Sequence, residues 1–552
     1  MTAENPTITQ KENIIFTATD QTKRLFRLIY DEKNKKPNSD DISRIKVSTL
    51  ISKMSFYYEK IRNYVDYKEE HLLRKNAIER TLKRQIIIEG VVKEQSVEDM
   101  ATHLLTELIR AGYLPNNEIP ESKIGETKII IDKYLTLRKI LLPQTNLLSK
   151  ESKETARWVI AMCASEIEEK LSDNKVTKHV ISQMYEILTS VVELPGDLPY
   201  EKDRDIQIYI GIHRAYLKFD RDMLEFQLLK YFNADWPQAS EDDINKVARN
   251  IEILKESINK QIEHPLVKQL NKIISSYTVY FSILEDVIRE DPTDVYDSFS
   301  EDPLSFSRLI KKNCNKRYKM TKTRLRRAAV RSIVYIFLTK MVLAILLEVP
   351  VTLWFGEALN YISLAINISF PPLLLFLIVL FTRVPSDANT QKIREGIESI
   401  VFKEKERQEP IKLRKPAKRG KITSSILGGF YFATFVFTFG LVIWALNKIH
   451  FNFVSIVIFL FFLTLVSFFS IRIRKGPKEM FVTEQKENFF VFIMDFFYVP
   501  IVAVGQWLNE KFSRLNVFVF LLDFIIEAPF KMFVEITEEW TRYVRERKED
   551  IM

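Results

Sequence analysis

Residues 426–446, "ILGGFYFATFVFTFGLVIWAL", and residues 451–470, "FNFVSIVIFLFFLTLVSFFS", contain no charged side chain. About 20 consecutive apolar residues are needed for a helix to cross roughly 30 Å of hydrocarbon, and both stretches meet that length. Two further apolar stretches lie near residues 332–351 and 360–381. The sequence therefore predicts an all-α, polytopic helical membrane protein with four transmembrane helices.

The flanks of these stretches differ in their content of Lys and Arg. Residues 311–331, "KKNCNKRYKMTKTRLRRAAVR", carry cations throughout and no acid, and the segments 383–424 and 471–488 are also basic. The 348–360 segment contains Glu348 and Glu357 but no Lys or Arg. Because basic loops stay on the cytoplasmic side, the pattern predicts an integral membrane protein of a bacterial-type plasma membrane with its N-terminal domain in the cytoplasm.

The net charge of +9 and the pI near 9.0 come largely from cations next to the apolar stretches. Attraction to anionic lipid head groups, about 1 kcal/mol per basic residue near the surface, explains such an excess without nucleic acid as a partner. The candidate contacts for anionic lipid are Arg324, Arg326, Arg327, Arg331, Lys415, Lys418, Arg419, Lys421, Arg472, Arg474 and Lys475.

Residues 41–310 repeat apolar residues at intervals of three and four, which is typical of amphipathic helices. The stretch "DISRIKVSTLISKMSFYYEKIRNYV", 41–65, is expected to form one of them, and Ser240 is expected to begin another as its N-cap. Further helices are expected near 68–89, 96–112, 125–141, 150–172, 175–193, 204–232, 241–262 and 265–290.

These patterns divide the chain into successive regions. They are a disordered or loosely ordered segment (1–40), a large cytoplasmic helical domain (41–310), a polybasic juxtamembrane segment (311–331), transmembrane helices 1 and 2 (332–382), a basic cytoplasmic loop (383–424), transmembrane helices 3 and 4 (425–470), a basic cytoplasmic segment (471–488), and amphipathic interfacial helices or a helical hairpin with a charged C-terminal helix (489–552).

Motifs for catalysis, cofactors and metals are missing from the sequence. The two cysteines, Cys163 and Cys314, lie far apart without a CxxC pattern, which suits a reducing compartment. The six histidines are scattered, and no GxGxxG, Walker A or HExxH sequence occurs. We therefore expect no catalytic, cofactor or metal site of a known kind, and an enzyme is the less favoured class.

Polar residues inside the apolar stretches are the candidate intramembrane site. An unpaired cation at the centre of a span costs about 2.5–3.5 kcal/mol, so Lys340 should face protein or water. The other candidates are Asn367, Pro371, Pro372, Asp495, Asp523 and Glu527, and the two prolines are expected to kink or break the second span.

The placement of the C-terminal acids stays open at this stage. Asp523, Glu527 and Lys531 lie at intervals of four, so they could mark the wet side of a helix in the membrane interface. Alternatively, the segments enter the bilayer as a hairpin and an acid among 495, 523 and 527 pairs with Lys340.

Three functional hypotheses follow from the sequence. The first is a non-enzymatic, membrane-anchored scaffold or adaptor whose cytoplasmic domain binds a protein partner, and a homo-oligomer is compatible with it. The second is a transporter or channel that uses Lys340 with Asp495, Asp523 or Glu527. The third is a membrane-bound enzyme without a recognisable motif.

Overall fold

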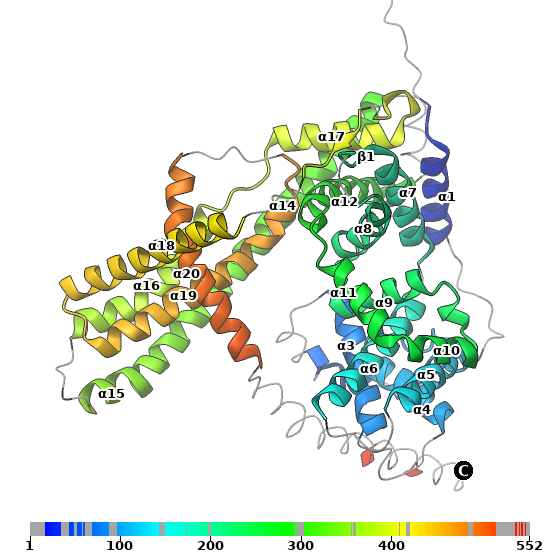
Figure 1. Cartoon of the computed structure of the whole chain (residues 1–552), viewed down its shortest axis with the longest axis horizontal. Helices are drawn as coiled ribbons and strands as arrows, with labels where there is room; N and C mark the ends of the chain where they lie inside the picture. Colours follow the sequence, from blue (N-terminus) through cyan, green and yellow to red (C-terminus); the bar gives the residue numbers. More distant parts are fainter. Residues whose placement is uncertain are drawn as a thin grey trace, which may run out of the picture. The chain divides into compact units, whose positions relative to one another are not determined.

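The protein is described here by a computed structural model, which covers the following residues: 17–34, 43–48, 52–53, 55–57, 59–60, 69–87, 96–142, 149–172, 174–196, 200–292, 295, 303–354, 356, 360–407, 409–415, 420–483, 489–514 and a few positions between 536 and 547. Almost all regular structure in them is helical (Figure 1). The exception is a short parallel pairing of β1 (Val192–Glu193) with β2 (Ile411–Lys412). The all-α prediction is confirmed.

The chain forms two compact units. Unit 1 comprises residues 1–26, 275–407 and 416–519, and unit 2 comprises residues 27–274, 408–415 and 520–552. Two helices, α1 (Asp20–Lys33) and α12 (Val267–Glu290), begin in one unit and end in the other.

The described part of unit 2 is built mainly from helices. They are α3 (Glu70–Ile87), α4 (Val97–Arg110), α5 (Ser122–Leu141), α6 (Lys150–Leu171), α7 (Lys175–Val191), α8 (Glu201–Ala215), α9 (Arg221–Phe232), α10 (Glu241–Arg249) and α11 (Ile251–Ile262), with a 3₁₀ turn η3 at Trp236–Gln238. Ser240 caps α10, and its hydroxyl accepts a hydrogen bond from the Asp243 N–H while the Asp243 carboxylate accepts one from the Ser240 N–H. This capping box satisfies two amide groups that the first turn would leave without partners.

The structure corrects four expectations about the N-terminal half. The helix expected over 204–232 is interrupted at Lys218, whose φ of 56° cannot continue a right-handed helix, and the one expected over 241–262 is interrupted at Asn250. Part of the segment expected to be loosely ordered, 1–40, forms α1, because Leu25, Phe26 and Ile29 share one buried face.

The fourth correction concerns the start of the helix expected over 41–65, whose described residues between 52 and 60 are helical as expected. Residues 43–48 are extended and not helical: the Ile45 N–H donates to the Ile119 carbonyl, and the Val47 N–H donates to the Asn116 side chain. Ile45 and Val47 are buried whereas Lys46 is exposed, which is the alternation of a strand. The period of two in "IKV" therefore decides the local conformation, although the wider spacing resembles a helix.

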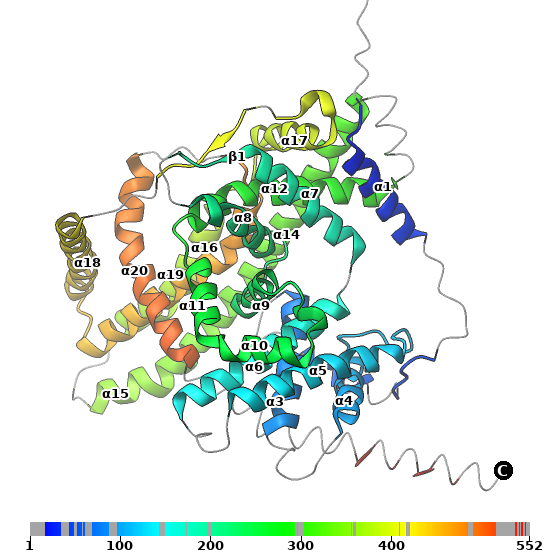
Figure 2. The same ribbon diagram turned by 45° about the vertical axis from the view of Figure 1, so that its right-hand side comes forward.

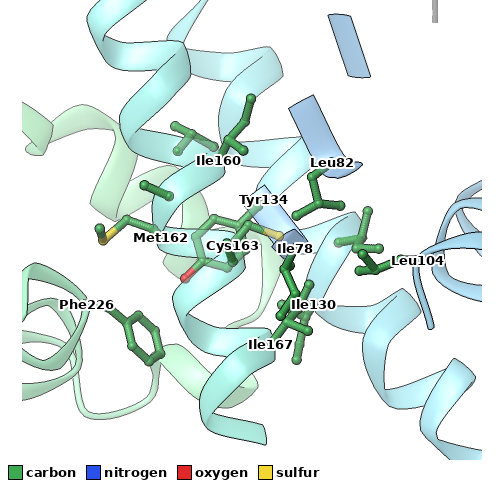
Figure 3. Close-up of a cluster of buried hydrophobic side chains, with 14 of the residues drawn as sticks. Ile78, Leu82, Leu104, Ile130, Tyr134, Ile160, Met162, Cys163, Ile167 and Phe226 are labelled. Atoms are coloured by element: carbon green, nitrogen blue, oxygen red, sulfur yellow. The ribbon is translucent and has the colours of Figure 1, made fainter. Parts of the chain in front are cut away.

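Helix α6 supplies the centre of the unit 2 core. Cys163, Met162 and Ile167 lie on this helix, and Figure 3 shows them with Tyr134 of α5 and Phe226 of α9. Burial raises the pKa of the Cys163 thiol well above its ordinary value, so the thiolate that would react is suppressed.

A buried ion pair crosses the edge of this core. The Lys133 ammonium donates to Glu166 Oε1 at 2.7 Å and to the Trp236 carbonyl at 2.8 Å. The Tyr134 hydroxyl donates to Glu166 Oε2 at 2.8 Å and accepts from the Trp236 indole N–H at 2.9 Å. Burial raises the pKa of Glu166, although the Lys133 charge opposes that shift.

His213 on α8 makes unit 2 sensitive to acid. Burial lowers the His213 pKa from 6.5 to about 4, although the hydrogen bond from its Nδ1–H to the Tyr209 carbonyl opposes the shift. Because the folded pKa lies below the unfolded one, the stabilising contribution is fully present above pH 6.5 and is lost as the pH falls towards 4. We expect the stability of α8 and α9 to fall by about 2 kcal/mol between pH 7.5 and pH 5 from this group alone.

Hydrogen exchange of the α8 and α9 amides at the two pH values, corrected for intrinsic rates, measures this loss. In His213→Leu the difference in the stability of α8 and α9 between the two pH values should shrink by the same amount. An equal pH dependence in both proteins would show that His213 is not its source.

Among the described residues, four helices are long and apolar enough to cross a membrane, and all four lie in unit 1. They lie within Ser305–Trp354, Tyr361–Leu380, Ile422–Lys448 and Phe453–Glu479. The first is composite, with α14 (Pro303–Leu343), a π-turn η4 (Ala344–Glu348) and α15 (Val349–Trp354) in succession; the others are α16 (Tyr361–Leu380), α18 (Lys421–Lys448) and α19 (Phe453–Glu479). Helices α14, α16 and α19 pack against one another, and Figures 1 and 2 show α16 and α19 beside the second half of α14.

The polybasic segment 311–331 is part of α14. Asn313, Cys314, Tyr318, Leu325 and Ala329 recur at about one-turn intervals and are buried, whereas most cations of the segment are exposed. The helix therefore continues from this basic stretch into the first apolar one without a break.

The segment expected to be a basic loop, 383–424, contains a helix, α17 (Asp387–Val401), followed by a 3₁₀ turn η5 (Lys403–Lys405). Asn389 of α17 is fully buried and joins two other elements. Its amide donates to the Tyr318 hydroxyl at 3.0 Å and to the Met480 carbonyl at 2.9 Å, and its Oδ1 accepts from the Val482 N–H at 2.8 Å. This side chain connects α17 to α14 and to the end of α19.

Helix α20 (Phe489–Arg514) packs against α19 and α18 (Figures 1 and 2). Helices α19 and α20 approach closely at Gly505, where an added Cβ would lie 2.1 Å from the Thr464 carbonyl oxygen. No ordinary side chain fits at that distance.

We expect Gly505→Ala to push α20 away from α19 and to lower the thermal midpoint of the protein in detergent by several degrees. Gly440→Ala on α18 is the matched control, because a Cβ there has no neighbour within 4 Å. Equal midpoints for the two variants would contradict the close contact between α19 and α20.

Candidate buried polar site between the apolar helices

Glu348 occupies the last position of the π-turn that interrupts the first apolar helix. Pro350 follows two residues later and has no N–H for the carbonyl one turn before it, so a regular α-helix cannot continue through this point. The chain widens instead, and the Val349 N–H donates to the Ala344 carbonyl. Such single π-turns inside helices occur frequently at functional sites.

The π-turn also brings Glu348 towards the side of the helix that carries Lys340. Eight residues of a regular α-helix turn about 800°, which leaves two side chains about 80° apart. A π-turn contains more residues per turn, so it reduces this angle. Both side chains are buried, Lys340 at 0% and Glu348 at 2% exposure.

One oxygen of the Glu348 carboxylate is held by two neighbouring helices. The Asn367 amide of α16 donates to Glu348 Oε1 at 2.6 Å, and the Ser455 hydroxyl of α19 donates to the same atom at 2.8 Å. Ser455 lies in the first turn of α19, whose N-cap is Asn452. The partial positive charge of that helix end therefore favours the anionic carboxylate.

The remaining polar atoms of this group have no hydrogen-bond partner among the described residues. They are Glu348 Oε2, Asn367 Oδ1, the hydroxyl of Thr352 and the ammonium of Lys340. All four residues are nearly or completely buried, and Thr352 lies one helical turn after Glu348. Buried polar atoms are normally paired, so a group of four unpaired ones marks this place as unusual.

Lys340 is close enough to Glu348 for the two charges to attract each other, but the described contacts include no direct ion pair between them. Its ammonium lies 4.1 Å from the centre of the Phe462 ring on α19. A cation over a ring face gains about 2 kcal/mol when it is desolvated, which offsets part of the cost of burial. The amine and the carboxylate thus remain separate groups.

The helices that surround Lys340 and Glu348 carry no other charged residue in their apolar stretches, so far as these stretches are described. Helix α16 has no Asp, Glu, Lys or Arg between Tyr361 and Leu380, and α19 has none between Phe453 and Ser470. The side chain of Asp495 on α20 lies outside the described residues. We name the group of Lys340, Glu348, Thr352, Asn367 and Ser455 the polar cluster.

The structure brings together only two of the seven residues proposed from the sequence. Lys340 and Asn367 belong to the polar cluster. Pro371 and Pro372 are buried within α16, which is continuous across them, so the helix does not break there, and a kink at these prolines stays a prediction. Asp523 and Glu527 lie outside the described residues, as does the side chain of Asp495, and their pairing with Lys340 stays a prediction.

Glu348 was missed because the sequence pattern placed it in the 348–360 loop. The signal that could have identified it is a glutamate two residues before a proline, at the end of an apolar run that also contains a lysine. A proline at that position predicts a disturbed helical turn. The disturbed turn, rather than the average hydropathy, decides which way the carboxylate faces.

The candidate lipid contacts are placed as follows. Arg324, Arg326, Arg327 and Arg331 are exposed on α14, Arg472 and Lys475 are exposed on α19, and Lys415 is exposed in unit 2. Arg474 is partly buried and donates to the Tyr498 hydroxyl at 2.8 Å. Lys418, Arg419 and the side chain of Lys421 lie outside the described residues.

A second candidate is a cavity of about 580 Å³ in unit 2, lined by charged side chains of both signs. Four of the charges at its wall are already paired: buried Lys133 with Glu166, and partly buried Lys230 with Glu169 at 2.6 Å. The described residues contain no group of three or more His, Cys, Asp and Glu that could hold a metal ion. The polar cluster is therefore the stronger candidate site.

Comparison with known proteins adds no functional information, because no family model matches the sequence and neither a curated protein nor a solved structure is significantly similar to it.

Proposed function

We propose that this chain is an integral membrane protein, with its N-terminal part in the cytoplasm, and that it moves protons across the bilayer through the polar cluster. The observation that carries the proposal is the Glu348 carboxylate, which is 2% exposed between three apolar helices and has one oxygen without a partner among the described residues. Ionisable groups inside membrane helices are expensive to bury, and they commonly mark proton or ion pathways.

Proton transfer suits the chemistry of the polar cluster. A carboxylate and an amine can each take up and release a proton, and here they lie on one helix without direct contact. Ser455 and Asn367 hold one carboxylate oxygen and leave the other available.

The test is proton flux into vesicles that contain the purified protein and a trapped pH-sensitive dye. We expect a potassium diffusion potential to drive acidification with the unmodified protein, and Glu348→Gln to reduce the rate at least about tenfold. Glu479→Gln is the matched control, since Glu479 lies at the end of α19 and pairs with Lys475 at 3.6 Å on the surface. Flux that is equal in both variants, or absent from the unmodified protein, would refute the proposal.

A membrane-anchored scaffold remains the second proposal. It is supported by unit 2, where the principal buried charges make ion pairs across helices: Arg74 with Glu168 at 2.7 Å, Lys75 with Asp222 at 2.6 Å, and Lys133 with Glu166. A rigid helical platform of this kind suits protein binding. Crosslinking in cells should then recover one dominant protein partner through residues 41–310, and recovery of none would count against it.

A further inference from the structure

The unpaired atoms of the polar cluster are mostly oxygens that can bind a cation. Glu348 Oε2 and Asn367 Oδ1 accept no hydrogen bond from the described residues. The Thr352 hydroxyl also has no hydrogen-bond partner among them. Carboxylate, amide and hydroxyl oxygens are the ligands that hard cations prefer.

The orientation of the Asn367 side chain follows from its neighbours. Its nitrogen faces two acceptors, Glu348 Oε1 at 2.6 Å and the Ser455 carbonyl at 3.3 Å, so its oxygen must be the atom left over. The Asn367 carbonyl also lacks the donor that it would have in a regular helix, because Pro371 has no N–H.

Charge balance decides which cation this arrangement fits. The two ionised groups, Lys340 and Glu348, sum to zero, so an added monovalent cation would leave one excess positive charge in an apolar surrounding. Loss of one proton from the Lys340 ammonium restores neutrality. A divalent cation would leave an excess positive charge even after that loss, and burying it is costly.

We propose that the polar cluster binds one monovalent alkali cation at Glu348, Thr352 and Asn367 in exchange for one proton from Lys340, which deepens the proton movement proposed above and depends on it. The step is balanced: the lysine ammonium and the aqueous cation become a neutral amine, a bound cation and an aqueous proton. The ammonium thus acts as the counter-ion of Glu348 when the cation is absent. Because binding effects are reciprocal, acid must displace the cation to the same extent as the cation displaces the proton.

The experiment uses the full-length protein in detergent at pH 7 in weak buffer with a pH indicator. Addition of NaCl, KCl or LiCl should release protons, approaching one per chain with the preferred cation, whereas choline chloride at equal ionic strength should release none. Glu348→Gln should abolish the release. Lys340→Met should bind the cation, measured with its radioisotope, without releasing a proton.

Thr352→Val keeps every charge and nearly the same shape, so we expect it to fold. It therefore tests the proposal even if the charge variants fail to fold. It should weaken the apparent cation affinity about tenfold and leave the number of protons released per chain unchanged. Release by choline, or alkali-driven release that persists in Glu348→Gln, would overturn the exchange. If no alkali cation releases protons but vesicles still show Glu348-dependent proton flux, the exchange is wrong and the proposed function stands; if the flux also fails, both are wrong.

Discussion

Lys340→Met is expected to lower the free energy of unfolding in detergent by about 3–5 kcal/mol, since it leaves the buried Glu348 carboxylate without its counter-charge. Glu348→Leu should be similarly harmful, because the Phe462 ring is then the one partner that the described residues offer the ammonium. The double variant Lys340→Met/Glu348→Leu removes both charges and should recover most of the loss. The reason is that apolar replacement of a whole buried pair is often neutral.

Denaturant titration of the four proteins measures the interaction between the two positions as a double-mutant cycle. Lys448→Met provides the control, because Lys448 is exposed at the end of α18 and its loss should change stability by no more than about 0.5 kcal/mol. Strictly additive effects of the two single variants would contradict a charge interaction between Lys340 and Glu348. Retained stability in the double variant together with lost proton flux would assign the pair to function rather than to folding.

The second large effect is expected in unit 2, at Lys133. Lys133→Met removes the ammonium that faces Glu166 and leaves that buried carboxylate with the Tyr134 hydroxyl as its donor. We expect a loss of about 3 kcal/mol at pH 8. Lys246→Met, at an exposed position of α10, should have almost no effect.

The pH dependence of the Lys133 variant distinguishes a charge effect from a packing effect. Burial raises the Glu166 pKa even in the unmodified protein, and loss of the opposing Lys133 charge must raise it further. A carboxyl whose pKa is raised in the folded state is neutral at low pH, and burial of the neutral form is tolerated. The folded protein loses stability as the pH rises through that folded-state pKa. The destabilisation should therefore be smaller at pH 5 than at pH 8, as measured by hydrogen exchange in α5 and α6; equal losses would indicate a packing defect instead.

Much of the helical architecture can be predicted from local sequence. The spacing of apolar residues identifies α3 to α7 to within a few residues, and the Ser240 cap is confirmed by its hydrogen bonds. The errors have local physical causes. Lys218 has a positive φ that no periodicity reveals, and the "IKV" alternation at 45–47 was hidden inside a longer pattern with helical spacing.

The candidate site was only partly predictable because hydropathy does not report which way a side chain faces. Lys340 and Asn367 stand out in apolar stretches, and both are buried as the cost of exposing them to lipid requires. Glu348 appears in the sequence as the first residue of a loop. Its position depends on the π-turn before Pro350 and on donors from residues 367 and 455, which only the folded chain brings together.

The central claim is that the first apolar helix carries Glu348 into the hydrocarbon layer, and single cysteines along this helix test it most directly. In a background with Cys163 and Cys314 changed to Ser, membrane-impermeant maleimide is applied to either side of sealed vesicles containing Arg326→Cys, Leu346→Cys or Trp354→Cys. All three side chains are exposed in the structure. We predict that residues 326 and 354 react from opposite sides and that residue 346 reacts from neither; reaction of 326 and 354 from the same side, or rapid reaction at 346, would contradict the account.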